Sequence, residues 1–310
     1  MTFRLGTRGS ALAMAQSGLV ADAVRAATGR DVELVEIVTP GDRSSAPIER
    51  LGVGVFVSAL RDALAAKEID FAVHSYKDLP TAPADGLTIA AIPEREDPRD
   101  ALVARDGLTL AQLPPGSRVG TSAVRRVAQL RALGLPIETL PLRGNVDTRL
   151  RKVASGELDA VVLARAGIAR LGRADEITEI LDPALMLPAP AQGALAVECR
   201  TEDFELLDVL ARLDDPSTRA AVTAERALLA TLEAGCSAPV AGLAETSAPL
   251  SDPSASAIEI HLRGAVYSLD GRVALRLART GTHTDAVEIG RLLAADLLAA
   301  GADTVLGVHQ

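Results

Sequence analysis

Short apolar runs alternate with longer amphipathic runs along most of the chain. Apolar runs of strand length occur at residues 3–6, 32–39, 71–74, 89–92, 101–104, 118–120, 137–142, 158–163 and 193–198. Residues 11–28 and 57–67 have the spacing of helices, and Ser10 is in place to cap the first of them. This alternation predicts an α/β fold built on sheets.

Two proline-containing connections interrupt the alternation, at residues 93–100 and 185–192. We interpret them as crossings between two α/β lobes. Domain 1 is then discontinuous and comprises residues 1–95 and 193–213, whereas domain 2 comprises residues 96–192. The predicted architecture is two lobes like those of periplasmic binding proteins, with a cleft and hinge crossings.

The C-terminal pattern differs and predicts a small α+β domain 3 at residues 214–310. Asp214-Asp215-Pro216 separates a helical pattern at 204–213, the end of domain 1, from a second one at 217–233, which leads to a strand pattern at 240–244. Residues 258–279 alternate like a β-hairpin around a turn at Asp270-Gly271. Residues 285–300 have the period of a closing helix.

Two strand–loop–helix units between residues 119 and 151 carry arginines near their helix starts. In the first, Thr121 or Ser122 can cap the helix, which places Arg125 and Arg126 in its first turn. Cations there oppose the helix dipole, so stability alone does not explain them. Guanidinium groups beside helix N–H groups instead favour an anion site.

The second unit repeats this arrangement. Arg143 lies in the loop, Asn145 can cap the helix, and Arg149 falls one turn inside it. Arginine forks bind carboxylates or phosphates in a bidentate manner. No glycine fingerprint for nucleotide binding accompanies them.

The composition indicates that the anion bound by these arginines is a small molecule and not a nucleic acid or a membrane surface. The net charge of −9 disfavours nucleic acid and anionic membranes, and 2% aromatic residues without Trp leave few platforms for bases. Two cysteines indicate no disulfide framework. No metal-ligand spacing, signal peptide or membrane span is recognisable, so we expect a cytoplasmic protein without a metal.

Two further features carry chemistry. Lys77 and Asp78 lie in the segment Ser75-Tyr76-Lys77-Asp78 that follows the apolar run 71–74, where ligands bind in α/β sheets, although a solvated turn with a local ion pair is the simpler interpretation. Cys236 lies in a Gly-Cys-Ser loop and could act as a nucleophile or attachment point, or be an inert thiol. We interpret His74 as a packed histidine and Cys199 as an inert thiol.

Seven runs together resemble the hydroxymethylbilane synthase family, also called porphobilinogen deaminase. They cover nearly the whole chain in the family's order. The runs are Thr-Arg-Gly-Ser (7–10), Val-His-Ser-Tyr-Lys-Asp-Leu-Pro (73–80), Glu-Arg-Glu-Asp-Pro-Arg-Asp (94–100), Val-Gly-Thr-Ser-Ala-Val-Arg-Arg (119–126), Leu-Arg-Gly-Asn-Val-Asp-Thr-Arg-Leu (142–150), Gln-Gly-Ala (192–194) and Leu-Glu-Ala-Gly-Cys-Ser-Ala-Pro (232–239).

The resemblance implies a monomeric transferase of tetrapyrrole and heme synthesis. Such an enzyme joins four porphobilinogens head to tail on a covalent dipyrromethane primer, releasing ammonia and finally hydroxymethylbilane. It implies a thioether to Cys236 and catalysis by Asp78. The implied cofactor-binding residues are Cys236, Lys77, Asp78, Thr121, Ser122, Arg125, Arg126, Arg143 and Gly144. The implied substrate-binding residues are Arg8, Ser10, Gln16, Phe56, Arg149, Arg170 and Gln192.

Two positions depart from the family pattern. Val53 stands where the family commonly has a lysine, and Ala123 where it has a serine. Neither departure touches Asp78 or Cys236. The alternative hypothesis is a non-catalytic bilobal protein that binds carboxylates. This hypothesis gives Cys236 and domain 3 no function.

Overall fold

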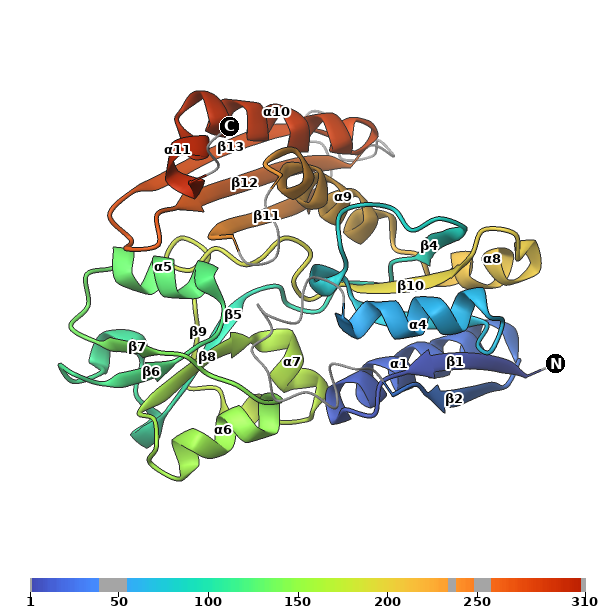
Figure 1. The fold of residues 1–310 in the computed structure, drawn as a ribbon, viewed down its shortest axis with the longest axis horizontal. Coiled ribbons are helices and arrows are strands. Elements are labelled where there is room, and N and C mark those ends of the chain that lie inside the picture. The colour runs from blue at the N-terminus through green and yellow to red at the C-terminus, as the bar shows by residue number, and fades with distance from the viewer. Residues whose placement is uncertain (1, 39–54, 234–237, 248–257, 308–310) are drawn as a thin grey trace. The chain divides into compact units, whose positions relative to one another are not determined.

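The computed structural model describes residues 2–38, 55–233, 238–247 and 258–307 (Figure 1). Contacts divide the chain into two compact units. The first unit comprises Met1–Arg95 and Ala194–Arg219, and the second comprises Glu96–Gly193 and Ala220–Gln310.

The first unit contains a five-stranded sheet in the order β2-β1-β3-β10-β4. Strand β10 runs antiparallel to both of its neighbours, while β1, β2 and β3 run parallel. The central strand β3 is almost wholly buried, as its apolar run predicts. The strands are β1 (Phe3–Thr7), β2 (Val32–Glu36), β3 (Phe71–Ser75), β4 (Leu87–Ala91) and β10 (Leu195–Arg200), and the helices are α1 (Ala11–Thr28), α4 (Val55–Ala65) and α8 (Phe204–Leu210).

The second unit begins with another five-stranded sheet, in the order β7-β6-β8-β5-β9. Here β5 is the strand antiparallel to both neighbours. The predicted strand 137–142 is shorter in the structure because Pro141 has no N–H for the ladder. The strands are β5 (Asp100–Ala104), β6 (Arg118–Gly120), β7 (Glu138–Leu140), β8 (Ala160–Ala164) and β9 (Glu179–Ile180), and the helices are α5 (Val124–Ala132), α6 (Val146–Ala154) and α7 (Arg165–Arg170).

The second unit also holds an antiparallel sheet in the order β11-β12-β13. Helix α10 lies along this sheet, and Leu228, Ile260 and Leu293 are buried in the core between them (Figure 1). The elements are β11 (Val240–Ser247), β12 (Glu259–Tyr267), β13 (Ala274–Thr282), α10 (Ala286–Ala299) and α11 (Ala302–Leu306), together with α9 (Pro216–Thr231), whose first four residues belong to the first unit. The predicted fold class, two α/β sheets and a small α+β part, is confirmed.

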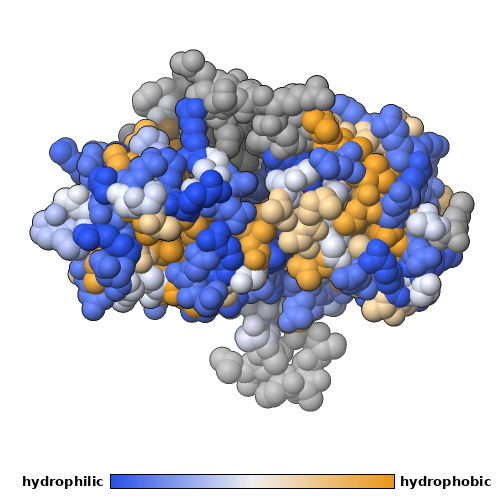
Figure 2. Space-filling view, turned by 90° about the horizontal axis from the view of Figure 1, so that it is seen from below, coloured by the Kyte–Doolittle hydropathy of each residue, from blue (hydrophilic) through white to orange (hydrophobic). Residues whose placement is uncertain are grey.

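No helix among the described residues is both long and apolar enough to cross a bilayer. The face drawn in Figure 2 mixes hydrophilic and hydrophobic residues.

Candidate functional site

Helix α5 begins with two buried arginines. β6 ends at Gly120 and α5 begins at Val124, so Arg125 and Arg126 fall in its first turn, as predicted. Their side chains are only 5% and 6% exposed. Two buried cations at the positive end of a helix dipole need a compensating charge.

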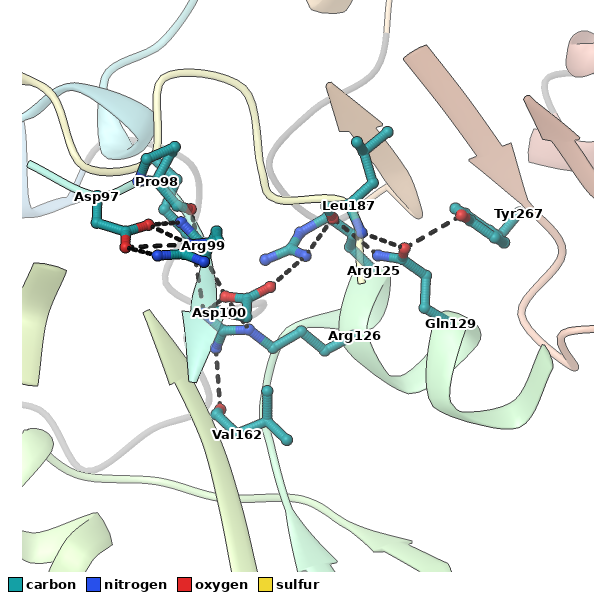
Figure 3. Close-up of polar contacts among 11 residues, drawn as sticks. Asp97, Pro98, Arg99, Asp100, Arg125, Arg126, Gln129, Val162, Leu187 and Tyr267 are labelled. Atoms are coloured by element: carbon teal, nitrogen blue, oxygen red, sulfur yellow. Dashed lines mark hydrogen bonds and ion pairs between the residues drawn. The ribbon is translucent and has the colours of Figure 1, made fainter. Parts of the chain in front are cut away.

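Asp100, the first residue of β5, supplies that charge (Figure 3). Its Oδ2 accepts from Arg125 Nη1 at 2.7 Å, and its Oδ1 accepts from Arg126 Nε at 3.0 Å and Nη2 at 2.8 Å. Burial alone would raise the pKa of Asp100, but the charges of Arg125 and Arg126 outweigh it and hold that pKa far below its ordinary value. Two guanidinium groups and one carboxylate leave a net positive charge.

The two guanidinium groups are engaged differently. Arg126 gives its Nε–Nη2 fork to Asp100 and donates Nη1 to Val162 O at 3.2 Å. Arg125 uses only Nη1, for Asp100 and for Leu187 O at 2.7 Å. Among the described residues, none accepts a hydrogen bond from Nε or Nη2 of Arg125. That fork has the geometry to bind a carboxylate in a bidentate manner.

Gln192 joins the same cluster from the returning connection. Its Nε2 donates to Pro98 O and to Asp100 Oδ1, both at 2.8 Å. Beside it, Arg170 Nη2 donates to Gly193 O at 2.6 Å, and burial lowers the pKa of Arg170. The structure therefore brings Arg125, Arg126 and Gln192 together around a residue that the sequence analysis did not select.

The loop before α5 differs from the prediction. Ala123 is the N-cap residue and makes no side-chain cap, so the prediction that Thr121 or Ser122 caps the helix is wrong. Ser122 is exposed, whereas Thr121 is buried. Thr121 Oγ1 has no hydrogen-bond partner within the described part of the chain. A buried hydroxyl without a partner is costly, and a ligand oxygen would satisfy it.

The second arginine loop is exposed. Arg143 and Gly144 precede α6, and the cap predicted at Asn145 is confirmed, since its side chain accepts from Thr148 N at 2.9 Å. Arg149 Nε donates to Gly144 O at 2.7 Å, which ties the start of the helix to the loop.

In the first unit, Lys77 and Asp78 lie in a single 3-10 turn, Tyr76–Asp78, directly after β3. Asp78 is exposed and the following Leu79 is buried. The buried Gln16 of α1 donates Nε2 to Ser75 Oγ at 2.9 Å, which connects the helix to the start of this turn.

Two other predicted residues lie at the start of α1. The cap at Ser10 is confirmed, because its Oγ accepts from Ala13 N at 3.3 Å. Arg8 precedes it and is half-buried.

His74 is a packed histidine, as interpreted. Its Nε2 lies 3.1 Å from Glu198 Oε2, and Arg61 Nη2 lies 2.8 Å from Glu198 Oε1. Burial raises the pKa of Cys199 to about 11, so this thiol is protonated at neutral pH. No cluster of metal-ligating side chains occurs in the described ranges.

Three positions from the sequence analysis lie outside the description. Cys236 and Val53 fall among residues that are not described. Phe56 belongs to α4, but its side chain is not described.

Asp100 is the clearest residue that sequence reasoning missed. It heads the otherwise apolar run Asp-Ala-Leu-Val-Ala, and an acid at the start of a buried strand is a signal for a buried partner. Residues 93–100 are interpreted from the sequence as a crossing, and the run 94–100 supports the family resemblance, but neither observation assigns Asp100 a role.

Comparison of the sequence with known proteins identifies the family to which this chain belongs. The profile described as "Porphobilinogen deaminase, dipyromethane cofactor binding domain" matches residues 3–208, and "Porphobilinogen deaminase, C-terminal domain" matches residues 219–299. The chain is 63% identical over 303 residues to porphobilinogen deaminase of Nocardia farcinica, covering 98% of this chain and 87% of that protein.

It is 61% identical over 299 residues to porphobilinogen deaminase of Mycobacterium tuberculosis, covering 96% of both. A periplasmic substrate-binding protein of an ABC transporter from Coxiella burnetii aligns with a TM-score of 0.44 at 12% identity, covering 70% of this chain and 93% of that one. By its two profile matches and its near full-length relatives, the chain belongs to the porphobilinogen deaminase family.

Proposed function

We propose that this chain performs porphobilinogen deaminase chemistry with Asp78 as the catalytic carboxylate and Cys236 as the attachment point of its cofactor. The activity is that of a transferase, which condenses four porphobilinogens head to tail and releases ammonia and hydroxymethylbilane. The alternative hypothesis, a non-catalytic carboxylate-binding protein, is therefore set aside. The observation that supports a carboxylate-binding site in the second unit is the Nε–Nη2 fork of Arg125, which is buried and available in a cationic cluster; the roles of Asp78 and Cys236 are proposed from the family resemblance.

The residues of the second unit fit a dipyrromethane, whose pyrroles carry acetate and propionate groups. The Arg125 fork and the unpartnered Thr121 hydroxyl are donors that suit carboxylate oxygens. When bound, the dipyrromethane supplies the pyrrole position to which substrate is joined. The residues proposed to hold it are Cys236, Lys77, Asp78, Thr121, Ser122, Arg125, Arg126, Arg143 and Gly144.

Asp78 is proposed to act on the substrate as ammonia leaves. Departure of the amine leaves a cationic pyrrole, which a nearby carboxylate stabilises electrostatically. The same carboxyl group can protonate the leaving amine. The hydrogen bond between Gln16 and Ser75 ties helix α1 to the residue that precedes the turn carrying Asp78.

The cationic side chains are proposed to neutralise the carboxylates of the growing chain. Gln192 and Arg126 contribute through Asp100, since their bonds already lead to it. The residues proposed at the substrate are Arg8, Ser10, Gln16, Phe56, Arg149, Arg170 and Gln192. We further propose three domains, at 1–95 with 193–213, 96–192 and 214–310, in a cytoplasmic monomer.

Intact-mass measurement tests the assignment. Wild type and the control Cys199→Ser should both carry the mass of a dipyrromethane, and Cys236→Ser should lack it. Asp78→Asn should keep this mass but lose turnover by about 100-fold or more. Equal adduct masses in wild type and Cys236→Ser would contradict the attachment, and unchanged turnover would remove Asp78 from its role.

A further inference from the structure

A buried chain of hydrogen bonds leads from Arg125 to a tyrosine of β12 (Figure 3). Arg125 Nη1 and Gln129 Nε2 both donate to Leu187 O, at 2.7 and 3.0 Å. Leu187 N donates to Gln129 Oε1 at 2.8 Å, and Tyr267 Oη donates to the same oxygen at 3.1 Å. All of these residues belong to the second unit.

This chain fixes the orientation of the Gln129 amide. Its NH₂ group must face the Leu187 carbonyl, and its oxygen must face the Leu187 N–H and the tyrosine hydroxyl. Both backbone groups of Leu187 are thereby held by one side chain. Gln129 follows Arg125 by four residues on α5, so the two side chains lie on the same helix face.

The surroundings strengthen these bonds. Leu187 and Tyr267 pack in a buried apolar cluster with Ala128, Ala241 and Leu243. Hydrogen bonds in such low-dielectric surroundings are stronger, and breaking one leaves a buried group unsatisfied. Burial raises the pKa of Tyr267, so its hydroxyl is a donor at neutral pH.

The hairpin that follows Tyr267 also contacts α5. Arg131 Nη1 donates to Leu269 O at 2.7 Å. Gly271 has a φ of +75°, and a Cβ there would lie 2.6 Å from Ala132 N, so only glycine permits this approach. The C-terminal part of α5 is therefore held by the β12–β13 hairpin.

We infer that Gln129 and Tyr267 are positioning residues for Arg125. They hold the Leu187 carbonyl that accepts from Arg125 Nη1, which leaves the Nε–Nη2 fork directed at a carboxylate of the cofactor or growing chain. The inference rests on the proposed function, in which Arg125 binds such a carboxylate. It assigns the orientation of the Arg125 side chain to Tyr267, at the end of β12, acting through Gln129.

Three variants and a control test the inference in the full chain. Gln129→Met keeps length and helix propensity without the amide, Tyr267→Phe removes one hydroxyl, and Arg125→Lys keeps the charge without the fork. Ile289→Val is the matched control, because it destabilises the third-sheet core without touching the hydrogen-bond chain. Each is compared by thermal midpoint, by the fraction of chains carrying the dipyrromethane mass, and by kcat and KM for porphobilinogen.

We expect Gln129→Met and Tyr267→Phe to lower kcat/KM by about 10- to 100-fold, in the same direction as Arg125→Lys, at a thermal midpoint close to that of the control. Values within about twofold of Ile289→Val for both variants would overturn the inference. If Gln129→Met does not fold, Tyr267→Phe alone decides. A wild-type protein without adduct and without turnover would instead refute the proposed function.

Discussion

Asp100→Asn is the substitution with the sharpest expected consequence for stability. The carboxylate accepts from Arg125 Nη1, from Nε and Nη2 of Arg126 and from Gln192 Nε2, at 2.7–3.0 Å. An asparagine would turn its NH₂ group toward at least one of these donors. It would also leave two buried guanidinium groups without a counter-charge.

The expected loss is large compared with the stability of a typical protein. Removing one partner from a buried ion pair costs about 3–5 kcal/mol, because an uncompensated buried charge remains. Total unfolding free energies are about 5–15 kcal/mol, so the variant should lose a substantial fraction of its stability.

The loss should also depend on pH with a definite sign. The folded-state pKa of Asp100 is far below its unfolded value of about 3.9. Such a carboxyl stabilises the native state fully above the unfolded pKa, and the contribution is lost as pH falls toward the folded pKa. The difference between wild type and variant should therefore be constant from about pH 6 to 8 and narrow below about pH 4.

Urea unfolding followed by far-ultraviolet circular dichroism measures this difference. Asp159→Asn is the matched control, since Asp159 also pairs with two arginines, Arg105 and Arg118, but directly before the central strand β8 of the same sheet, where both arginine side chains are exposed. Its loss should be about 1 kcal/mol or less. An Asp100→Asn loss no larger than that of the control, or a gap that does not narrow in acid, would refute the reasoning.

Two further predictions concern α5 and the buried cysteine. Ala123→Ser should raise the unfolding free energy by about 1 kcal/mol in urea, because Ala123 has extended N-cap geometry without a side-chain cap; no gain would contradict this. Cys199 should resist iodoacetamide in the native protein at pH 8 and react in urea, because burial raises its thiol pKa to about 11. Peptide mass mapping reads out the label, and rapid native labelling would show that the site opens.

The local parts of the candidate site could be predicted from the sequence. A polar residue before a helical run gave the caps at Ser10 and Asn145 correctly. Strand and helix periods also placed Arg125 and Arg126 in a first helical turn, and Asp78 in the turn that follows β3. These features depend on neighbours within a few residues, so chain order contains the information.

Only the tertiary structure decided which partners those side chains bind. Asp100 meets Arg126 across 26 residues of sequence, and Tyr267 meets Gln129 across 138. The fork of Arg126 binds Asp100, whereas the fork of Arg125 stays available for a ligand, and this difference depends on such distant partners. The sequence by itself determined the types of charged group and the elements that carry them. Folding decided their pairing, because burial forces each charge to find whichever partner the packed chain brings within hydrogen-bond reach.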